Sequence, residues 1–66
     1  MNERTNFNIG TVVRAVGPII DVEFPTLMPP LGRALKIEKT GLILEVIEYM
    51  SDRVVRCMAL SSTDTI

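Results

Sequence analysis

The chain has 66 residues, of which 47% are hydrophobic, and it carries a formal net charge of −1. This length predicts one small domain with a marginal core, because such a chain buries only roughly 60% of its unfolded surface. The charge excludes the basic face of a typical nucleic-acid-binding protein, and no apolar run reaches the roughly 18 residues of a membrane-spanning helix. The polar first residues do not resemble a secretory signal, and the lone cysteine, Cys57, fits a reducing compartment.

The first half of the chain predicts a tail, two strands and a loop. Residues 1–8 are polar and are expected to form a flexible tail. The run from Ile9 to Val16 is rich in β-branched residues and predicts the first strand. Gly17-Pro18 interrupts it with a bend, and Ile19 to Phe24 follow as a second strand with alternating apolar and acidic positions. Three prolines and a glycine between Pro25 and Gly32 indicate a loop.

The second half predicts three further strands. The segment Arg33 to Glu38 alternates apolar and charged residues, and a turn at Lys39-Thr40-Gly41 joins it to the next strand in a hairpin. Leu42 to Met50 form that fourth strand; their spacing also suits a helix, but the β-branched residues and the short length favour a strand. The fifth strand runs from Val54 to Leu60, and Ser61 to Ile66 form a polar exit.

These short strands, separated by turns and uninterrupted by any linker, indicate an all-β domain over residues 9–66. The expected architecture is a small antiparallel barrel or sandwich. Five or six strands in so few residues favour closure into a barrel, because closure removes the unpaired edges that an apolar sheet leaves exposed.

Candidate catalytic groups are few, because the chain contains no histidine. This removes the commonest general base, the histidine-assisted nucleophiles and most zinc sites. Cys57 lies in the middle of the fifth predicted strand, and although Arg56 is its neighbour in sequence, adjacent strand residues point to opposite faces. A buried, unreactive cysteine is therefore favoured over a nucleophile.

Two pairs of carboxylates are candidate acid–base groups. Asp21 and Glu23 are expected on one face of the second strand, about 7 Å apart, which is within the range of a glycosidase-like pair. A solvated strand surface is the favoured interpretation, since no insertion that would form a cleft is visible. Glu45 and Glu48 are expected on opposite faces of the fourth strand, where they could act together only across a bend.

Nucleotide binding is not predicted from this chain either. A phosphate-binding loop needs backbone N–H groups at the start of a helix and usually a lysine after its last glycine. The Lys39-Thr40 pair precedes a glycine rather than following one, and no glycine of the chain is followed by lysine; the four are Gly10, Gly17, Gly32 and Gly41. We therefore predict no catalytic, cofactor-binding or metal-binding residue in this chain.

Four segments, in the same order and at matching spacing, resemble one protein family. Gly10 to Phe24 look like its first two strands, and Met28 to Leu35 resemble its proline-rich loop and the strand that follows. Leu44-Glu45-Val46 and the stretch from Val54 to Asp64 resemble its closing strands and exit. The family is the beta subunit of F-type ATP synthases, and the Gly17-Pro18-Ile19-Ile20-Asp21 element with the double proline resembles beta rather than alpha subunits.

The resemblance implies a six-stranded antiparallel barrel of Greek-key-like form at the N-terminus of the beta subunit. In that family, alpha and beta barrels alternate in a ring at the top of the catalytic hexamer, so the implied partners are alpha subunits. The parent enzyme makes or hydrolyses ATP with Mg²⁺ and couples this reaction to proton or sodium transport. Its phosphate-binding loop and catalytic carboxylate match nothing in this chain. The implied location is peripheral, on the cytoplasmic side of the bacterial inner membrane, without insertion into it.

The function predicted on this basis is non-catalytic: the barrel holds the alternating hexamer together while the catalytic domains open and close. One alternative is the barrel of a related ATPase, such as a vacuolar-type or flagellar export enzyme, or of the transcription terminator of similar architecture. A second, from another class, is a small barrel that binds single-stranded nucleic acid, a role that short strands suit but that the net charge opposes. An unrelated β-barrel without an assignable function is the remaining interpretation.

Overall fold

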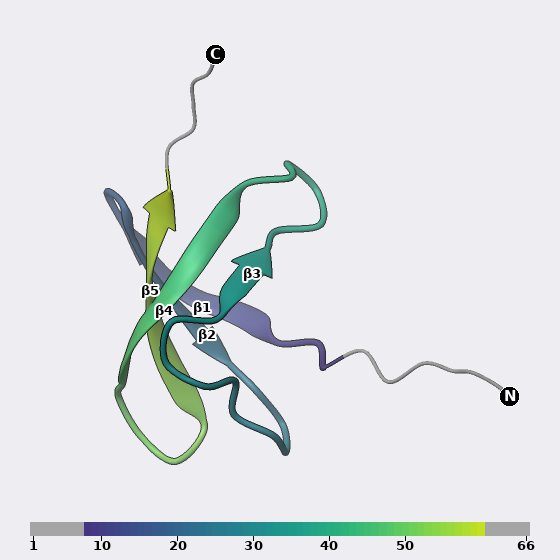
Figure 1. The fold of residues 1–66 in the computed structure, drawn as a ribbon, viewed down its shortest axis with the longest axis vertical. Helices are drawn as coiled ribbons and strands as arrows, with labels where there is room; N and C mark the ends of the chain where they lie inside the picture. Colours follow the sequence, from purple (N-terminus) through teal and green to yellow (C-terminus); the bar gives the residue numbers. More distant parts are fainter. Residues whose placement is uncertain (1–7, 61–66) are drawn as a thin grey trace, which may run out of the picture.

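The computed structural model describes residues 8–60, which fold as one twisted antiparallel sheet (Figure 1). Its strands are β1 (Thr11–Val16), β2 (Ile19–Glu23), β3 (Ala34–Lys36), β4 (Ile43–Tyr49) and β5 (Val54–Leu60). The all-β prediction is confirmed: β5 has the predicted bounds, and the other strands are one or two residues shorter at their ends. The polar exit and all of the predicted tail except Asn8 lie outside the described residues. No helix in residues 8–60 is long and apolar enough to cross a membrane.

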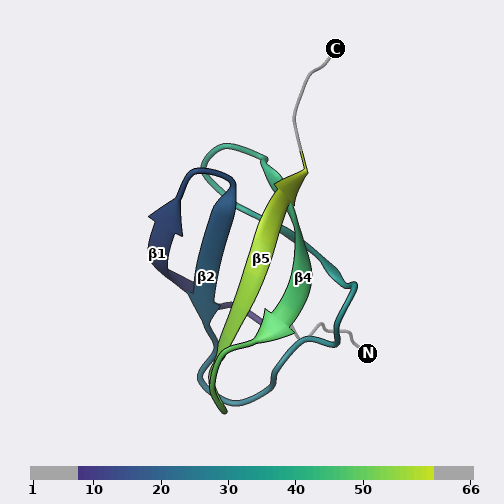
Figure 2. The same cartoon turned by 90° about the vertical axis from the view of Figure 1, so that its left-hand side faces the viewer.

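The strand order in the sheet is β1-β2-β5-β4-β3, and all neighbouring strands are antiparallel. Figure 2 shows β1, β2, β5 and β4 side by side in one curved layer. Because direction alternates along this order, the edge strands β1 and β3 run the same way and cannot pair antiparallel with each other. The described residues therefore form an open sheet of five strands, whereas the sequence predicted closure into a barrel and the family resemblance implied six strands. A strand between β1 and β3 would have to run antiparallel to both.

The core lies on one face of the sheet and is supplied mainly by β2, β4 and β5. Partly buried side chains around β3, Leu35 and Ile37 among them, pack against it. Burial of each aliphatic core side chain contributes roughly 1.5–3 kcal/mol relative to exposure. The predicted alternation is confirmed, because Ile20, Val22 and Phe24 all lie in the core. The buried core residues are Ile20, Val22, Phe24, Leu44, Val46, Val55 and Cys57.

Two hairpin turns use glycine in the left-handed conformation. Gly17 lies between β1 and β2 with φ of 58°, and Gly41 lies between β3 and β4 with φ of 77°. In the second turn the Gly41 N–H donates to the Ile37 carbonyl (2.7 Å), and the Thr40 hydroxyl accepts from the Leu42 N–H (3.1 Å). These bonds confirm the predicted hairpin between the third and fourth strands.

A bulge in β4 changes which of its side chains share a face. The register between β4 and β5 shifts at Ile47, which has no partner of its own in the ladder. Glu45 and Glu48 consequently lie opposite Met58 and Arg56, two residues apart on β5, and so project from the same face. The prediction that the two carboxylates lie on opposite faces is wrong, because the extra residue supplies the bend that simple alternation lacks.

Gly10 allows the chain to cross closely over the end of β2 before β1 begins. A Cβ atom at this position would lie 2.7 Å from Val22 Cγ1, 2.8 Å from the Glu23 carbonyl oxygen and 2.9 Å from Phe24 Cε2. Contacts this short require the neighbours to move, and one of them is backbone. The crossing therefore depends on the absence of a side chain, a requirement that strand patterning did not reveal.

The first test concerns this crossing. Gly10→Ala is expected to lower the free energy of unfolding by about 1–3 kcal/mol, because the added methyl group overpacks the contact with β2. Urea denaturation followed by circular dichroism measures the change. Thr11→Ser, at the next and exposed position, is the control and should change the same quantity by less than about 0.5 kcal/mol. Unchanged stability of Gly10→Ala would contradict the close approach.

Candidate functional site

The face of the sheet opposite the core carries a row of charged side chains, one from each of four strands. Arg14 on β1 lies opposite Asp21 on β2. Asp21 in turn lies opposite Arg56 on β5, and Arg56 lies opposite Glu48 on β4. Positive and negative groups thus alternate across the sheet, which is the favourable order for cross-strand neighbours. We call these four residues the charge row.

The centre of the charge row is an ion pair with two hydrogen bonds. The Arg56 guanidinium donates from Nε to Asp21 Oδ1 (2.9 Å) and from Nη2 to Asp21 Oδ2 (3.1 Å). Asp21 is only 7% exposed, so the expectation that it belongs to a solvated surface is wrong. Its partner lies 35 residues further along the chain, and the local strand pattern did not show what covers it. Glu23, by contrast, is exposed as expected.

This ion pair determines the charge of Asp21. The hydrogen bonds from Arg56 lower the pKa of the Asp21 carboxyl below its ordinary value of 3.8, while burial opposes them. The positive charges of Arg56 and Arg14 lower the pKa further. Asp21 is therefore ionised at neutral pH and is unsuited to be the proton donor of a glycosidase-like pair with Glu23.

A set of apolar side chains lies beside the charge row on the same face. The register places Val16 opposite Ile19, and Ile19 opposite Met58, so that β1, β2 and β5 each contribute one residue. Val16 is 57% exposed and Met58 41% exposed. We call these three residues the apolar row. The charge row borders this strip on β1, β2 and β5.

Between the two rows the surface forms a hollow of about 210 Å³, which we call the outer hollow. Two guanidinium groups and one carboxylate line it on one side, and two aliphatic side chains line it on the other. These lining residues are Arg14, Asp21, Arg56, Val16 and Ile19.

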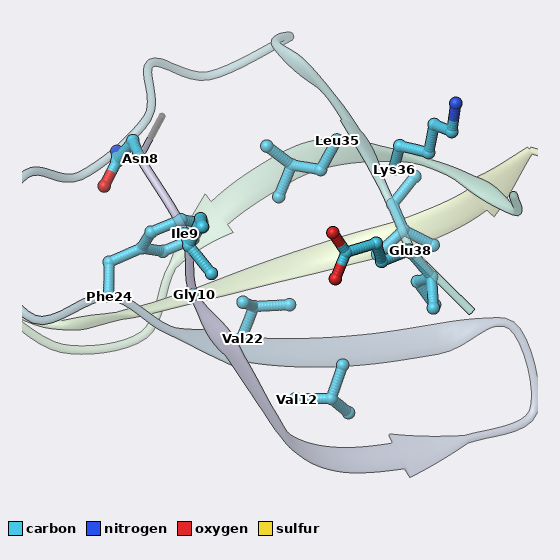
Figure 3. A pocket seen from close by; sticks show the side chains of 11 residues that line it. Asn8, Ile9, Gly10, Val12, Val22, Phe24, Leu35, Lys36 and Glu38 are labelled. Atoms are coloured by element: carbon cyan, nitrogen blue, oxygen red, sulfur yellow. The ribbon is translucent and has the colours of Figure 1, made fainter. Parts of the chain in front are cut away.

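A second cavity, of about 400 Å³, lies between the start of β1 and β3, where the sheet is open (Figure 3). Figure 3 shows Val12 and Val22 on one wall and Leu35 on the other, all directed into the space. Its charged lining residues are Lys36 and Glu38. The mainly apolar walls suit the packing of another apolar segment better than acid–base chemistry.

Cys57 is fully buried and lies opposite Ile20 on β2 and Val46 on β4. Burial raises the pKa of its thiol, and the negative charge of Asp21 raises the pKa further. The prediction of a buried cysteine is confirmed. Within the part of the chain that the structure describes, no group of three or more His, Cys, Asp and Glu side chains is placed to hold a metal ion.

The ion pair predicts a particular pH dependence of stability. Because the folded-state pKa of Asp21 lies below 3.8, the pair stabilises the fold at every pH above that value. This contribution is lost as the pH falls below 3.8 and through the folded-state pKa. Asp21→Asn should therefore be less stable than the parent chain at neutral pH, and the difference should narrow as the pH falls below about 4. Urea denaturation at a series of pH values, with Glu23→Gln as the control on the same face, measures it. A difference that stays constant down to about pH 2 would contradict the assignment.

The cysteine gives an independent probe of folding. Cys57 is expected to react with a disulfide reagent such as DTNB at least about 100-fold more slowly in the folded chain than in urea, because a buried thiol with a raised pKa presents little thiolate. Absorbance of the released thiolate follows the reaction. Asp52→Cys in the exposed turn before β5, in a Cys57→Ala background, should react quickly in both conditions. Rapid labelling of Cys57 in the folded chain would show that the core is accessible.

Comparison with known families identifies the ATP synthase alpha/beta family, beta-barrel domain, whose model matches residues 12–66. The match covers β2 to β5 completely and all of β1 except its first residue. It agrees with the all-β fold, with the order of the resembling segments and with the barrel-like curvature of the sheet. The chain belongs to the ATP synthase alpha/beta family and represents its beta-barrel domain.

Proposed function

We propose that this chain is the N-terminal barrel of an F-type ATP synthase beta subunit, and that it holds the subunits of an alternating alpha/beta hexamer together. The observation that carries the proposal is the family match over residues 12–66. The charge row and the apolar row on the outer face of the sheet supply a surface suited to that role. The Gly17-Pro18-Ile19-Ile20-Asp21 element and the double proline at 29–30 support a beta rather than an alpha subunit.

The beta-like residues have structural roles in this fold. The Pro18 carbonyl accepts a hydrogen bond from the Ala59 N–H (2.8 Å), which ties the first hairpin turn to β5. Asp21 forms the central ion pair. Pro29 is buried, and its carbonyl accepts from the Tyr49 hydroxyl (2.9 Å), which fixes the proline-rich loop against β4. These residues are therefore explained by the shape of the barrel, in agreement with a non-catalytic role.

A domain with this role has to stay rigid while the catalytic domains of the enzyme change conformation. Rigidity is supported by β5, which pairs with β2 on one side and β4 on the other. It is supported again by the core on one face of these strands and the Asp21–Arg56 ion pair on the other. A sheet held on both faces bends little, so a ring of such barrels keeps its subunits in place.

The parent protein on this proposal makes or hydrolyses ATP with Mg²⁺ and couples the reaction to transport of protons or sodium ions. Its nucleotide site belongs to other parts of the hexamer, and its partners are alpha subunits. The proposed location is peripheral, on the cytoplasmic side of the bacterial inner membrane. The barrel of a related rotary or export ATPase remains the alternative within the family, and the sequence of the adjoining domain separates the two.

Two described aromatic residues argue against a barrel that binds single-stranded nucleic acid. Such barrels stack bases on exposed aromatic rings beside a basic groove. Phe24 is only 3% exposed, which leaves Tyr49, at 47%, as the one exposed aromatic ring within residues 8–60. The charge row alternates in sign and offers no continuous basic track for phosphates.

The proposal is tested by mixing the 66-residue chain with the barrel of an alpha subunit and measuring association by sedimentation velocity. We expect a complex at roughly micromolar to hundred-micromolar concentrations, because a single contact of a larger ring is weak when isolated. Each barrel alone, at the same total concentration, is the control. Absence of any mixed complex at about 1 mM would contradict the proposal.

A further inference from the structure

The segment between β2 and β3, residues 25–31, is attached to the sheet through side chains rather than through a strand ladder, and we call it the proline strap. It loops out beyond the end of β2 before the chain returns at β3 (Figure 1). We propose that the proline strap is a lid that opens while the sheet stays paired, and that Asn8 and Tyr49 are the two residues that hold it closed. This inference goes beyond the proposed function and does not depend on it.

The backbone of the proline strap makes few hydrogen bonds of its own. Three of its seven residues are prolines, which have no N–H to donate. Within residues 8–60, the one backbone hydrogen bond to the strap is a local bond at the Pro30 carbonyl. Just before the strap, the Phe24 N–H donates to the Arg53 carbonyl (2.8 Å). Just after it, the Gly32 N–H donates to the Val46 carbonyl (2.7 Å), so the strap is a span whose backbone is fixed at its two ends.

Two side chains from other parts of the chain bond to the middle of the strap. Asn8, which precedes β1, donates from Nδ2 to the Leu27 carbonyl (2.6 Å). Tyr49, at the end of β4, donates from its hydroxyl to the Pro29 carbonyl (2.9 Å). Neither bond belongs to a strand ladder, so both can break without disturbing the pairing of the strands.

The packing of the strap is confined to its middle. Met28 is partly buried against the core, and Pro29 is buried. On either side of them, Leu27 is 65% exposed and Leu31 is 58% exposed. A segment with few buried contacts and no ladder of its own belongs to the part of a structure that opens at low free energy. We therefore expect the strap to open at a lower free energy than the separation of the strands.

Gly32 lies where a hinge of such a lid is needed. Its φ is 84°, in the left-handed region, and a Cβ atom at this position would have no heavy atom beyond its chain neighbours within 4 Å. With neither a side chain nor close neighbours to restrict it, the backbone can rotate here as the strap opens. We expect this rotation to break the bond from the Gly32 N–H, which is the last bond before the strap.

Opening of the strap would uncover part of the core. A space of about 600 Å³ lies between the strap and β3, and Phe24 and Leu35 are among its lining residues. The same two residues also line the cavity between the start of β1 and β3. The two spaces therefore adjoin, and an open strap would give solvent access to apolar side chains that the closed strap covers.

The test is amide hydrogen exchange of the 66-residue chain, followed by NMR with and without low concentrations of urea. We expect the protection factor of the Gly32 amide to be at least about tenfold lower than that of the best protected amides of β2 and β5. Its exchange should depend weakly on urea, because opening of the strap exposes little surface, whereas exchange in β2 and β5 should depend on it strongly.

Variants identify the residues that hold the strap. Tyr49→Phe and Asn8→Ala should each speed exchange of the Gly32 amide about threefold to tenfold, because each removes a hydrogen bond present only in the closed strap. Thr40→Val is the matched control, since it removes the hydroxyl that accepts from the Leu42 N–H (3.1 Å) in both the open and the closed state. It should speed exchange in β2 and β5 but change that of the Gly32 amide by less than about twofold.

Two results would overturn the proposal. If the Gly32 amide follows the amides of β2 and β5 in urea and in Thr40→Val, the strap opens only when the whole sheet unfolds. If the Gly32 amide exchanges through its own opening but Tyr49→Phe and Asn8→Ala leave its rate unchanged, these two residues do not hold the strap. Neither result bears on association with an alpha-subunit barrel, so the proposed function is tested separately.

Discussion

The pairing of β2 with β5 is the constraint on which the rest of this structure depends. It sets Ile20 opposite Cys57, and Asp21 opposite Arg56, across segments that are 35 residues apart. In this register one face of both strands is apolar and the other carries the ion pair. A slip of one residue would turn Asp21 toward the core and Ile20 toward the outside. Burial of the apolar face and formation of the Asp21–Arg56 ion pair therefore both require this register of β2 against β5.

The remaining strands are placed by this central pair. β1 returns along β2 through the glycine turn, and β4 returns along β5, so the outermost positions fall to β1 and to the short β3. The charge row exists because these registers agree across four strands, including the shift at Ile47 that brings Glu48 opposite Arg56. The charge row therefore depends on the bulge. Without the extra residue at Ile47, Glu48 would point toward the core.

Features that depend on neighbouring residues could be predicted from the sequence, whereas features that depend on distant ones could not. Alternation and glycine placement act within a few positions, and they predicted the strands, the hairpin at Gly41 and the burial of Cys57. The burial of Asp21 and the close approach at Gly10 arise where separate segments meet, and alternation carries no information about such meetings. The candidate site falls in the second group: its residues were visible individually, but their common face follows from strand register. The residue pattern predicted the five strands that are found, whereas the sixth was implied by the family resemblance and is not among the described residues.

The limited size of the domain connects its stability to its proposed role. Within residues 8–60, more large apolar side chains are exposed than buried, and much of the exposed set lies on β1 and the outer face. A domain of this size gains little from its own core, and within residues 8–60 the outer sides of β1 and β3 have no partner strand. On the proposed function, neighbouring barrels of a ring would cover part of this apolar surface, so residues that add little to the isolated fold would stabilise the assembly.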